Sequence, residues 1–272
     1  MALKTDETHV RSIDTFRLGV DGVIQALTDS IFILVAIQFF AVGDFWKGLI
    51  PSSRFIGYFL SSPLNAVLNR SGIRRSRTFF ALTLTAAAAL ALGSIVPNGV
   101  VYAIAVSLCS AACHLRQPFF TDLYGEFYHS ENRARQISLG LRLNLAITLG
   151  TGLGCGYILD QNLNWWRWIN GCTVVFLLAV AFFLLRLPER NSSIRNESWL
   201  SAITLPFRNA RFVYVETAWM LVGFGNLWTL PLRAIYLAES ERGMALSPSM
   251  VTLILVVIPV GFQFQSLLDG LA

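Results

Sequence analysis

Residues 164–190 restrict the possible folds of this chain more than any other stretch. They read NWWRWINGCTVVFLLAVAFFLLRLPER. The run 169–185 contains no charged residue, and with the flanking tryptophans it reaches the ~20 residues that cross ~30 Å of hydrocarbon. Indole rings prefer the level of the lipid headgroups, which favours the tryptophans at 165, 166 and 168 at one membrane surface and Arg186 at the other. The stretch therefore predicts one transmembrane helix.

The composition extends this interpretation to the whole chain. Hydrophobic residues make up 54% of the 272 residues and charged residues only 14%, whereas roughly 25% of the residues in ordinary soluble domains are charged. Such a chain lacks the polar surface that a soluble protein of this length needs. The net charge of +5 does not indicate nucleic-acid binding, because the arginines are scattered between apolar runs and do not gather on one face.

Eight apolar runs predict an all-α polytopic transmembrane helix bundle. Each run approaches the length of a bilayer crossing, although several, among them the first, second, fourth and fifth, contain charged residues. The predicted spans are Leu18–Val42, Gly48–Leu68, Thr78–Val96, Val100–Leu123, Gln136–Leu159, Trp165–Leu185, Phe212–Leu237 and Pro248–Leu268.

Lysine and arginine are distributed unevenly between the two sides of these spans. Of the 21, 14 lie in the N-terminal tail and in the connections after the second, fourth and sixth spans, whereas 3 lie in the other connections and 4 inside spans. Short cytoplasmic loops carry an excess of these cations. We therefore expect the tail and those three connections in the cytoplasm, with the protein in the inner membrane of the cell.

Motifs of common enzymes are absent from the sequence. It contains no His-Glu-x-x-His, no Gly-x-Ser-x-Gly and no glycine-rich phosphate loop ending in Lys-Ser/Thr, and it has only three histidines. The four cysteines, Cys109, Cys113, Cys155 and Cys172, all fall within predicted spans, where packing is a simpler role than metal binding or a disulfide. We expect no enzymatic activity, no metal and no organic cofactor.

Three stretches resemble the major facilitator superfamily of secondary transporters. Between the second and third spans, NAVLNRSGIRRSR resembles the Gly-x-x-x-Asp-Arg-x-Gly-Arg-Arg loop of that family, with Asn69 in place of its Asp. Between the fourth and fifth spans, PFFTDLYGEFYHSENRARQIS resembles its Pro…Asp/Glu…Arg-x-x-x-x-Ser passage. LGTGLGCGYILD and NWWRWIN resemble its glycine-rich fifth span and the entry to its sixth.

In the resembled family, the first two stretches help to hold one conformation closed on the cytoplasmic side. The resemblance therefore implies a conformational latch here, in which Asn69 can form hydrogen bonds but not the charged pair of the family's Asp. The implied latch residues are Asn69, Arg70, Gly72, Arg74, Arg75, Glu126 and Arg133. The glycines of the fifth span, at 150, 152, 154 and 156, form two Gly-x-x-x-Gly pairs that allow helix backbones to approach closely, and plain helix packing is a sufficient role for them.

The resemblance covers nearly the whole chain but only about two thirds of the family's twelve spans. It implies an N-terminal tail (1–17), a six-span half (18–187), a cytoplasmic linker (188–211) and the first two spans of a second half (212–272), so we expect an incomplete twelve-span fold. The implied function is secondary active transport of a small solute by alternating access across the lipid bilayer, with a proton as the candidate coupling ion. The alternative is a non-transporting receptor, scaffold or remnant that keeps the fold.

Charged residues at bilayer depth form the candidate site. Each costs roughly 2.5–3.5 kcal/mol on insertion scales, so such residues are expected to face a cavity and to pair. At ~1.5 Å per residue, Asp29 and His114 both lie about 20 Å from the outer surface, and the long side chain of Arg54 reaches toward them. Our hypothesis is that Asp29 or His114 binds the coupling proton, that Arg54 or Arg116 holds an anionic part of the substrate, and that Gln25 adds a hydrogen bond. The alternative is a structural ion pair between Asp29 and an arginine.

Two further charged residues, Asp21 and Arg142, lie nearer the cytoplasmic ends of their spans. We expect them to reach the membrane surface or to contact loops, outside the candidate site.

The cation distribution generates a prediction about topology. A reporter that is active only in the periplasm should stay silent when it is fused after Arg190, because this position follows a predicted cytoplasmic exit. The same reporter fused after Trp165 should be active. Strong periplasmic activity after Arg190 would contradict the predicted orientation.

Overall fold

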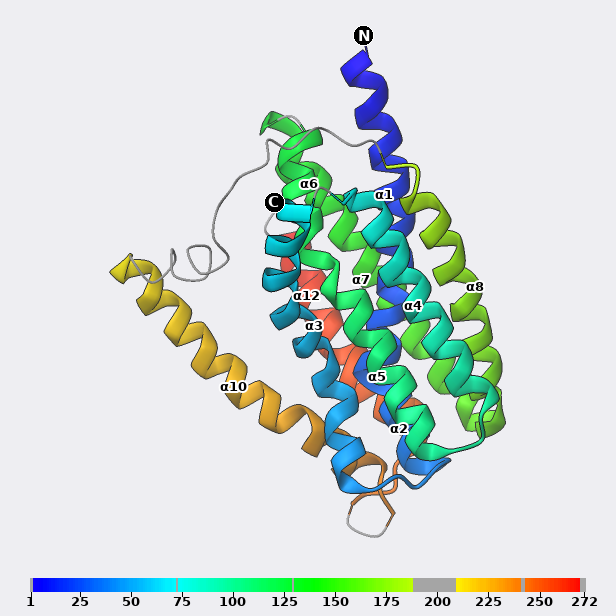
Figure 1. Ribbon diagram of the computed structural model, residues 1–272. Coiled ribbons are helices and arrows are strands. Elements are labelled where there is room, and N and C mark those ends of the chain that lie inside the picture. Colours follow the sequence, from blue (N-terminus) through cyan, green and yellow to red (C-terminus); the bar gives the residue numbers. More distant parts are fainter. Residues whose placement is uncertain (1, 72, 129, 188–208, 241–242, 270–272) are drawn as a thin grey trace.

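The computed structural model describes residues 2–71, 73–128, 130–187, 209–240 and 243–269. Within these ranges every regular element is a helix, and most of the helices lie side by side in one bundle (Figure 1). We call the end that holds the N-terminus and the connection between residues 71 and 75 the N-terminal end. The other end, which holds residues 39–43 and 96–98, is called the opposite end.

Each predicted span coincides with one helix or with a continuous series of helices. The first span consists of α1 (Ala2–Ala26), the π-helical turn η1 (Leu27–Ile31) and α2 (Phe32–Gln38). It is followed by α3 (Asp44–Ser71), α4 (Arg75–Ile95), α5 (Gly99–Leu115), α6 (Gln117–Phe127), α7 (Ser130–Gln161), η2 (Leu163–Trp165), α8 (Trp166–Leu184), α10 (Ala210–Ala238), α11 (Pro248–Thr252), the π-helical turn η4 (Leu253–Val257) and α12 (Ile258–Asp269). The all-α fold class is thereby confirmed.

Five helical segments in the described part of the chain are long and apolar enough to cross a membrane, namely His9–Gln38, Arg75–Ile95, Gly99–Thr121, Arg133–Gln161 and Leu163–Leu184. The segment Pro248–Gln263 is apolar but shorter, and α3 and α10 are not among the five. Helix α1 begins at Ala2, so the described part of the predicted tail is helical and continuous with the first span. Most of the predicted linker, residues 188–208, lies outside the described residues.

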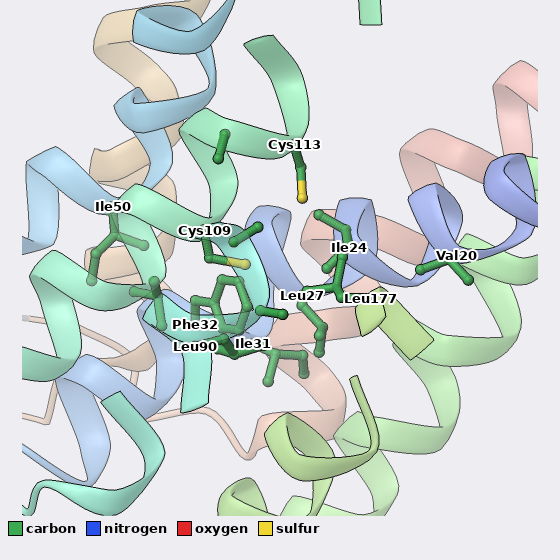
Figure 2. Close-up of a cluster of buried hydrophobic side chains, with 14 of the residues drawn as sticks. Val20, Ile24, Leu27, Ile31, Phe32, Ile50, Leu90, Cys109, Cys113 and Leu177 are labelled. Atoms are coloured by element: carbon green, nitrogen blue, oxygen red, sulfur yellow. The ribbon is translucent and has the colours of Figure 1, made fainter. Parts of the chain in front are cut away.

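The first span forms the centre of the bundle. In its most apolar stretch 83% of the residues are buried, compared with 22–61% in the other four apolar segments. Figure 2 shows Ile24, Leu27 and Phe32 of this span inside a cluster of buried side chains that also includes Cys109 and Cys113. Both of these thiols are free and at most 1% exposed, as expected for cysteines that serve packing.

Helices α1 and α7 approach each other closely and are joined by polar side chains. A Cβ atom at Gly22 would lie 2.5 Å from the carbonyl oxygen of Asn144, so the two backbones are almost in contact. The Nδ2 group of Asn144 donates to the Leu18 carbonyl (2.9 Å), and the Thr148 hydroxyl donates to the Gly22 carbonyl (3.1 Å). Small residues and interhelical hydrogen bonds are the usual means of holding membrane helices together.

The glycine-rich part of α7 contacts the last helices of the chain. Cβ atoms at Gly152 and Gly156 would lie 3.2 Å from Val256 and 3.1 Å from the Cα atom of Ser249, so close approach is confirmed for this pair. At Gly150 and Gly154 a Cβ atom would meet no heavy atom of the described chain within 4 Å.

The tryptophans at the start of α8 have two different environments. Trp165 and Trp168 are 47% and 69% exposed, whereas Trp166 is 1% exposed and its ring packs against those of Phe39, Phe40 and Tyr102. All three tryptophans lie at the start of α8, but the ring of Trp166 faces the protein, whereas those of Trp165 and Trp168 are exposed. A hydropathy pattern locates the end of a span but does not tell which of its aromatic rings faces the protein.

The close approach of α3 and α5 generates a prediction about stability. A Cβ atom at Gly57 would lie 2.4 Å from the Ala111 carbonyl oxygen. Gly57→Ala should therefore lower the free energy of unfolding in detergent by about 1–3 kcal/mol, the usual cost of overpacking. Gly171→Ala is the matched control, because a Cβ atom there meets nothing within 4 Å, and alanine's helix propensity should raise stability by up to about 1 kcal/mol. Equal melting temperatures for the two variants would contradict the contact.

Candidate functional site

Asp29 lies in η1, the π-helical turn that interrupts the first span. Such turns are rare, and they occur frequently at functional sites, where the wider turn changes the direction of a side chain. The side chain of Asp29 is 16% exposed, whereas its neighbours Thr28 and Ser30 are buried. The turn therefore leaves the carboxylate of Asp29 partly exposed, while the residues on both sides of it are buried.

Arg54 of α3 forms an ion pair with Asp29 through its Nη1 group. The pair satisfies the requirement that charges within the membrane be neutralised. The guanidinium carbon of Arg54 also lies 4.9 Å from the centre of the Phe55 ring, while its Nε atom is buried without a hydrogen-bond partner. Gln25 lies one turn before Asp29, and its side chain contributes a hydrogen bond to the carboxylate.

His114, near the end of α5, is 5% exposed and lies close enough to Asp29 for an electrostatic interaction. Its Nδ1 atom is 2.7 Å from the carbonyl oxygen of Ser110. A carbonyl oxygen only accepts hydrogen bonds, so Nδ1 carries the hydrogen, and in the neutral ring Nε2 has a free lone pair. The ring of Tyr58 packs edge-on against His114 at 5.4 Å between centroids, and its hydroxyl donates to Gln117 Oε1 at 2.7 Å. The structure thus brings together four of the five predicted site residues.

The fifth, Arg116, lies in a separate group of charges that we call the buried charge cluster. Asp21 is its centre, because one carboxylate oxygen accepts from Arg17 Nη1 (2.5 Å) and the other accepts from Arg116 Nη2. Arg17 also binds Asp14 (2.6 Å), and Arg116 donates to the Thr83 hydroxyl (2.5 Å). The cluster contains two carboxylates and two guanidiniums, so its charges balance.

A break in the fourth span directs Arg116 into this cluster. Pro118 lies at the start of α6, where it has no backbone N–H and its ring would clash with the carbonyl four residues earlier. Helix α5 therefore ends at Leu115, and Arg116 occupies the junction with its side chain 0% exposed.

The structure gives Asp21 and Arg116 a partner that the sequence interpretation did not assign to them, namely each other. Asp21 does not reach the membrane surface, because its side chain is 4% exposed and both carboxylate oxygens are paired. Arg116 is neutralised by Asp21 and therefore presents no free charge to an anion in this conformation. Asp14, Arg17 and Asp21 follow each other at intervals of three and four residues, which places them on one helix face. This spacing indicates a charge cluster in the sequence, whereas the depth of each residue in its span does not.

Two tyrosines outside the spans line the N-terminal edge of the cluster. Burial, followed by the carboxylate of Asp14, raises the pKa of Tyr128 well above its ordinary value. Burial likewise raises the pKa of Tyr124, although the charge of Arg17 works in the other direction. Both hydroxyls are therefore protonated at neutral pH, and that of Tyr124 accepts from Arg17 Nη2 (2.9 Å) and donates to Asp14 (3.3 Å).

The implied latch is described only in part. Arg133 donates to the backbone carbonyls of Gly125 (3.1 Å) and Tyr128 (3.2 Å), so it stabilises the turn between α6 and α7. Arg74 precedes α4 and Arg75 is its first residue. Gly72 and the side chains of Asn69, Arg70 and Glu126 lie outside what the structure describes, so the latch stays a prediction.

A third polar group joins α3 to α10 at the opposite end. Lys47 Nζ lies 2.6 Å from Glu239 and 3.1 Å from Asp44, while the amide of Gln38 donates to the carbonyls of Ala238 (3.4 Å) and Leu246 (3.2 Å). Burial works to lower the pKa of Lys47, but its hydrogen bonds to Glu239 and Asp44 outweigh burial and raise it. A cavity of about 550 Å³ lies beside these residues. No pattern in the sequence predicts this contact, because Lys47 and Glu239 lie 192 positions apart.

Comparison with solved structures relates the fold to a transporter. The chain is similar to the crystal structure of a bacterial homologue of the human lysosomal transporter Spinster in an inward-facing and unoccupied conformation, with a TM-score of 0.53 and 16% sequence identity. The match covers 95% of this chain and 59% of that one, so the present chain spans about three fifths of the transporter's length. No family model and no curated protein matches the sequence. At this identity the likeness shows the fold alone, a polytopic helix bundle like that of the matched structure.

The buried charge cluster generates a second prediction about stability. Asp21→Asn should lower the free energy of unfolding by about 3–5 kcal/mol, because it leaves Arg116 buried without a counter-charge. The double variant Asp21→Leu/Arg116→Met should recover part of this loss, since it removes both charges. Glu131→Gln, at an exposed position of α7, should change stability by less than about 0.5 kcal/mol. A melting temperature of Asp21→Asn equal to that of the Glu131 variant would contradict this role.

Proposed function

We propose that this protein is a secondary active transporter that moves a small solute across the membrane by alternating access, with a proton as the coupling ion. The observation that carries the proposal is the group of Asp29, Arg54 and His114, which meet from three spans inside a bundle with the fold of a transporter. Ionisable residues within a membrane are costly and commonly mark the pathway of a substrate or proton.

In the proposed mechanism, Asp29 alternates between two partners. While it is ionised, it pairs with Arg54, as in the described conformation. When it binds a proton, the pair loses its attraction, and the guanidinium of Arg54 becomes available to an anionic group of the solute. The Nε2 atom of His114 is a second possible proton acceptor beside the pair, because its Nδ1 atom is held by Ser110.

The proposed orientation places the N-terminal end in the cytoplasm. The excess of arginine and lysine in the connections at that end supports this orientation. The contacts of Lys47 and Gln38 with α10 then close the extracellular end in the described conformation.

The experiment compares Asp29→Asn, Arg54→Gln and His114→Gln in proteoliposomes that contain the intact protein. Uptake of a panel of small solutes is first measured with and without a proton gradient, in order to find one that accumulates. Asp29→Asn should abolish the dependence of uptake on the gradient. Arg54→Gln should reduce uptake by at least about tenfold, since losing one member of a hydrogen-bonded charge pair costs roughly 2–5 kcal/mol.

Arg135→Gln, at an exposed position of α7, is the control and should transport normally. If all three site variants insert and accumulate the solute with unchanged pH dependence, the proposed site is wrong. If the unaltered protein accumulates no solute under any gradient, transport itself is contradicted, and the non-transporting alternative is favoured.

A further inference from the structure

A cavity of about 210 Å³ lies between α1, α6 and α7, next to the candidate site. Two of the residues that line it are in direct contact with that site. Gln25 contributes a hydrogen bond to the carboxylate of Asp29, and Gln117 accepts one from Tyr58, whose ring packs against His114. Pockets that hold drug-sized ligands measure roughly 300–1,000 Å³, so this cavity fits a small solute or part of one.

The charges in the lining of this cavity are already paired in the described conformation. Arg17 and Asp21 are the charged residues among the described side chains that line it, and they bind each other. The guanidinium of Arg17 also binds Asp14, and the second carboxylate oxygen of Asp21 accepts from Arg116. A charged group that entered the cavity would lose water without gaining a free counter-charge, so the lining favours an uncharged group.

Three amide side chains in the lining each keep one polar end without a partner in the described part of the chain. A side-chain amide has an oxygen that accepts hydrogen bonds and an NH₂ group that donates them. The oxygen of Gln117 is bound to Tyr58, which leaves its NH₂ group as a donor. The NH₂ group of Asn144 donates to a carbonyl of α1 and that of Gln25 to the ionised Asp29, so both keep an oxygen as an acceptor. Donors and acceptors in one lining suit hydroxyl groups, since a hydroxyl both donates and accepts.

The cavity and the guanidinium of Arg54 are close enough to bind two parts of one solute. Gln25 and Asp29 are four residues apart, which is about 6 Å along the helix. The guanidinium of Arg54 lies against Asp29, and in the proposed mechanism it binds the anionic group once Asp29 carries a proton. A chain of about four to six atoms, at ~1.5 Å per bond, therefore reaches from Arg54 into the cavity.

We infer that the transported solute is a small monoanion whose uncharged body carries several hydroxyl groups, which the amides of Gln25, Gln117 and Asn144 bind in the cavity. The inference rests on the proposed function, in which Arg54 binds the anionic group, and it adds the chemical class of the solute. A second charge on the solute is disfavoured, because the charges in the lining already neutralise each other. An apolar body is disfavoured, because it would leave the amides without water or a partner.

The test compares the binding of three six-carbon probes to the purified intact protein in detergent. Gluconate has a carboxylate and hydroxyls along its chain, hexanoate has the carboxylate alone, and sorbitol has hydroxyls alone. Each dissociation constant follows from the rise of the melting temperature with probe concentration. Gluconate should bind at least about tenfold more tightly than either of the others, because each of them leaves one part of the site without its partner.

Substitutions distinguish the two parts of the site. Gln25→Leu and Gln117→Leu should each weaken gluconate binding by about three- to tenfold, the usual effect of one lost hydrogen bond, and should leave hexanoate binding unchanged. Arg54→Gln should weaken the binding of both anions by the same factor. A purely structural role of the amides would change both anions alike, so the readout is the ratio of the two dissociation constants. Gln161→Leu, at an exposed position at the end of α7, is the matched control and should change neither.

Hexanoate binding as tight as that of gluconate would overturn the inference, as would a ratio that Gln25→Leu and Gln117→Leu leave unchanged. Binding of none of the three probes would overturn it as well. None of these results contradicts proton-driven uptake, which the proteoliposome experiment measures separately. Selective binding of gluconate by a protein that accumulates no solute under any gradient would keep the site and reject transport.

Discussion

The guanidinium of Arg116 is fully buried in a helix bundle that offers it no bulk water, and much of the structure follows from the need to neutralise it. Asp21 supplies the charge, and it is shared with Arg17, which in turn holds Asp14. Buried ion pairs repay their desolvation only when the geometry is good and the remaining donors are satisfied. The hydroxyl of Thr83 takes one of these donors, so the single charge of Arg116 fixes the positions of α1, α4 and the junction of α5 and α6 relative to each other.

Prediction from the sequence succeeded where a fixed dimension of the helix or of the bilayer decides the outcome. A helix or a series of helices lies at each of the eight predicted runs, and five described segments are long and apolar enough to cross a membrane. The meeting of Asp29, Arg54 and His114 follows from the rise per residue, because depth depends only on position in the run. Arg116 was beyond such an argument, because the break before Pro118 changes its direction. The pair of Lys47 and Glu239 joins residues 192 positions apart, and only the packing of α3 against α10 brings them together.

The turn that holds Asp29 is linked to the last part of the chain through α7. The first and the last described spans each contain a π-helical turn, η1 and η4, and these two turns contact each other as well as α7. The glycines at 152 and 156 make this possible, since they allow the backbone of α7 to lie against α11 and η4. A shift of the last span would therefore act directly on the turn around Asp29, whereas Asp14, Arg17 and Asp21 of the buried charge cluster lie about two to four helical turns away.

The contacts between α10 and the first six spans are concentrated at one end. Ala234, Leu237 and Ala238 are buried beside Lys47 and Gln38, whereas the Ala210 end of α10 leans away from the bundle (Figure 1) and Phe212, Tyr214 and Leu221 are exposed. A helix attached at one end can pivot there. The charge of Glu239 is neutralised by Lys47, so separating them would leave two charges at the membrane surface, where water can solvate both. Breaking Asp29 from Arg54 inside the bundle has no such compensation, so in the proposed mechanism a proton on Asp29 lowers the free-energy cost of releasing Arg54.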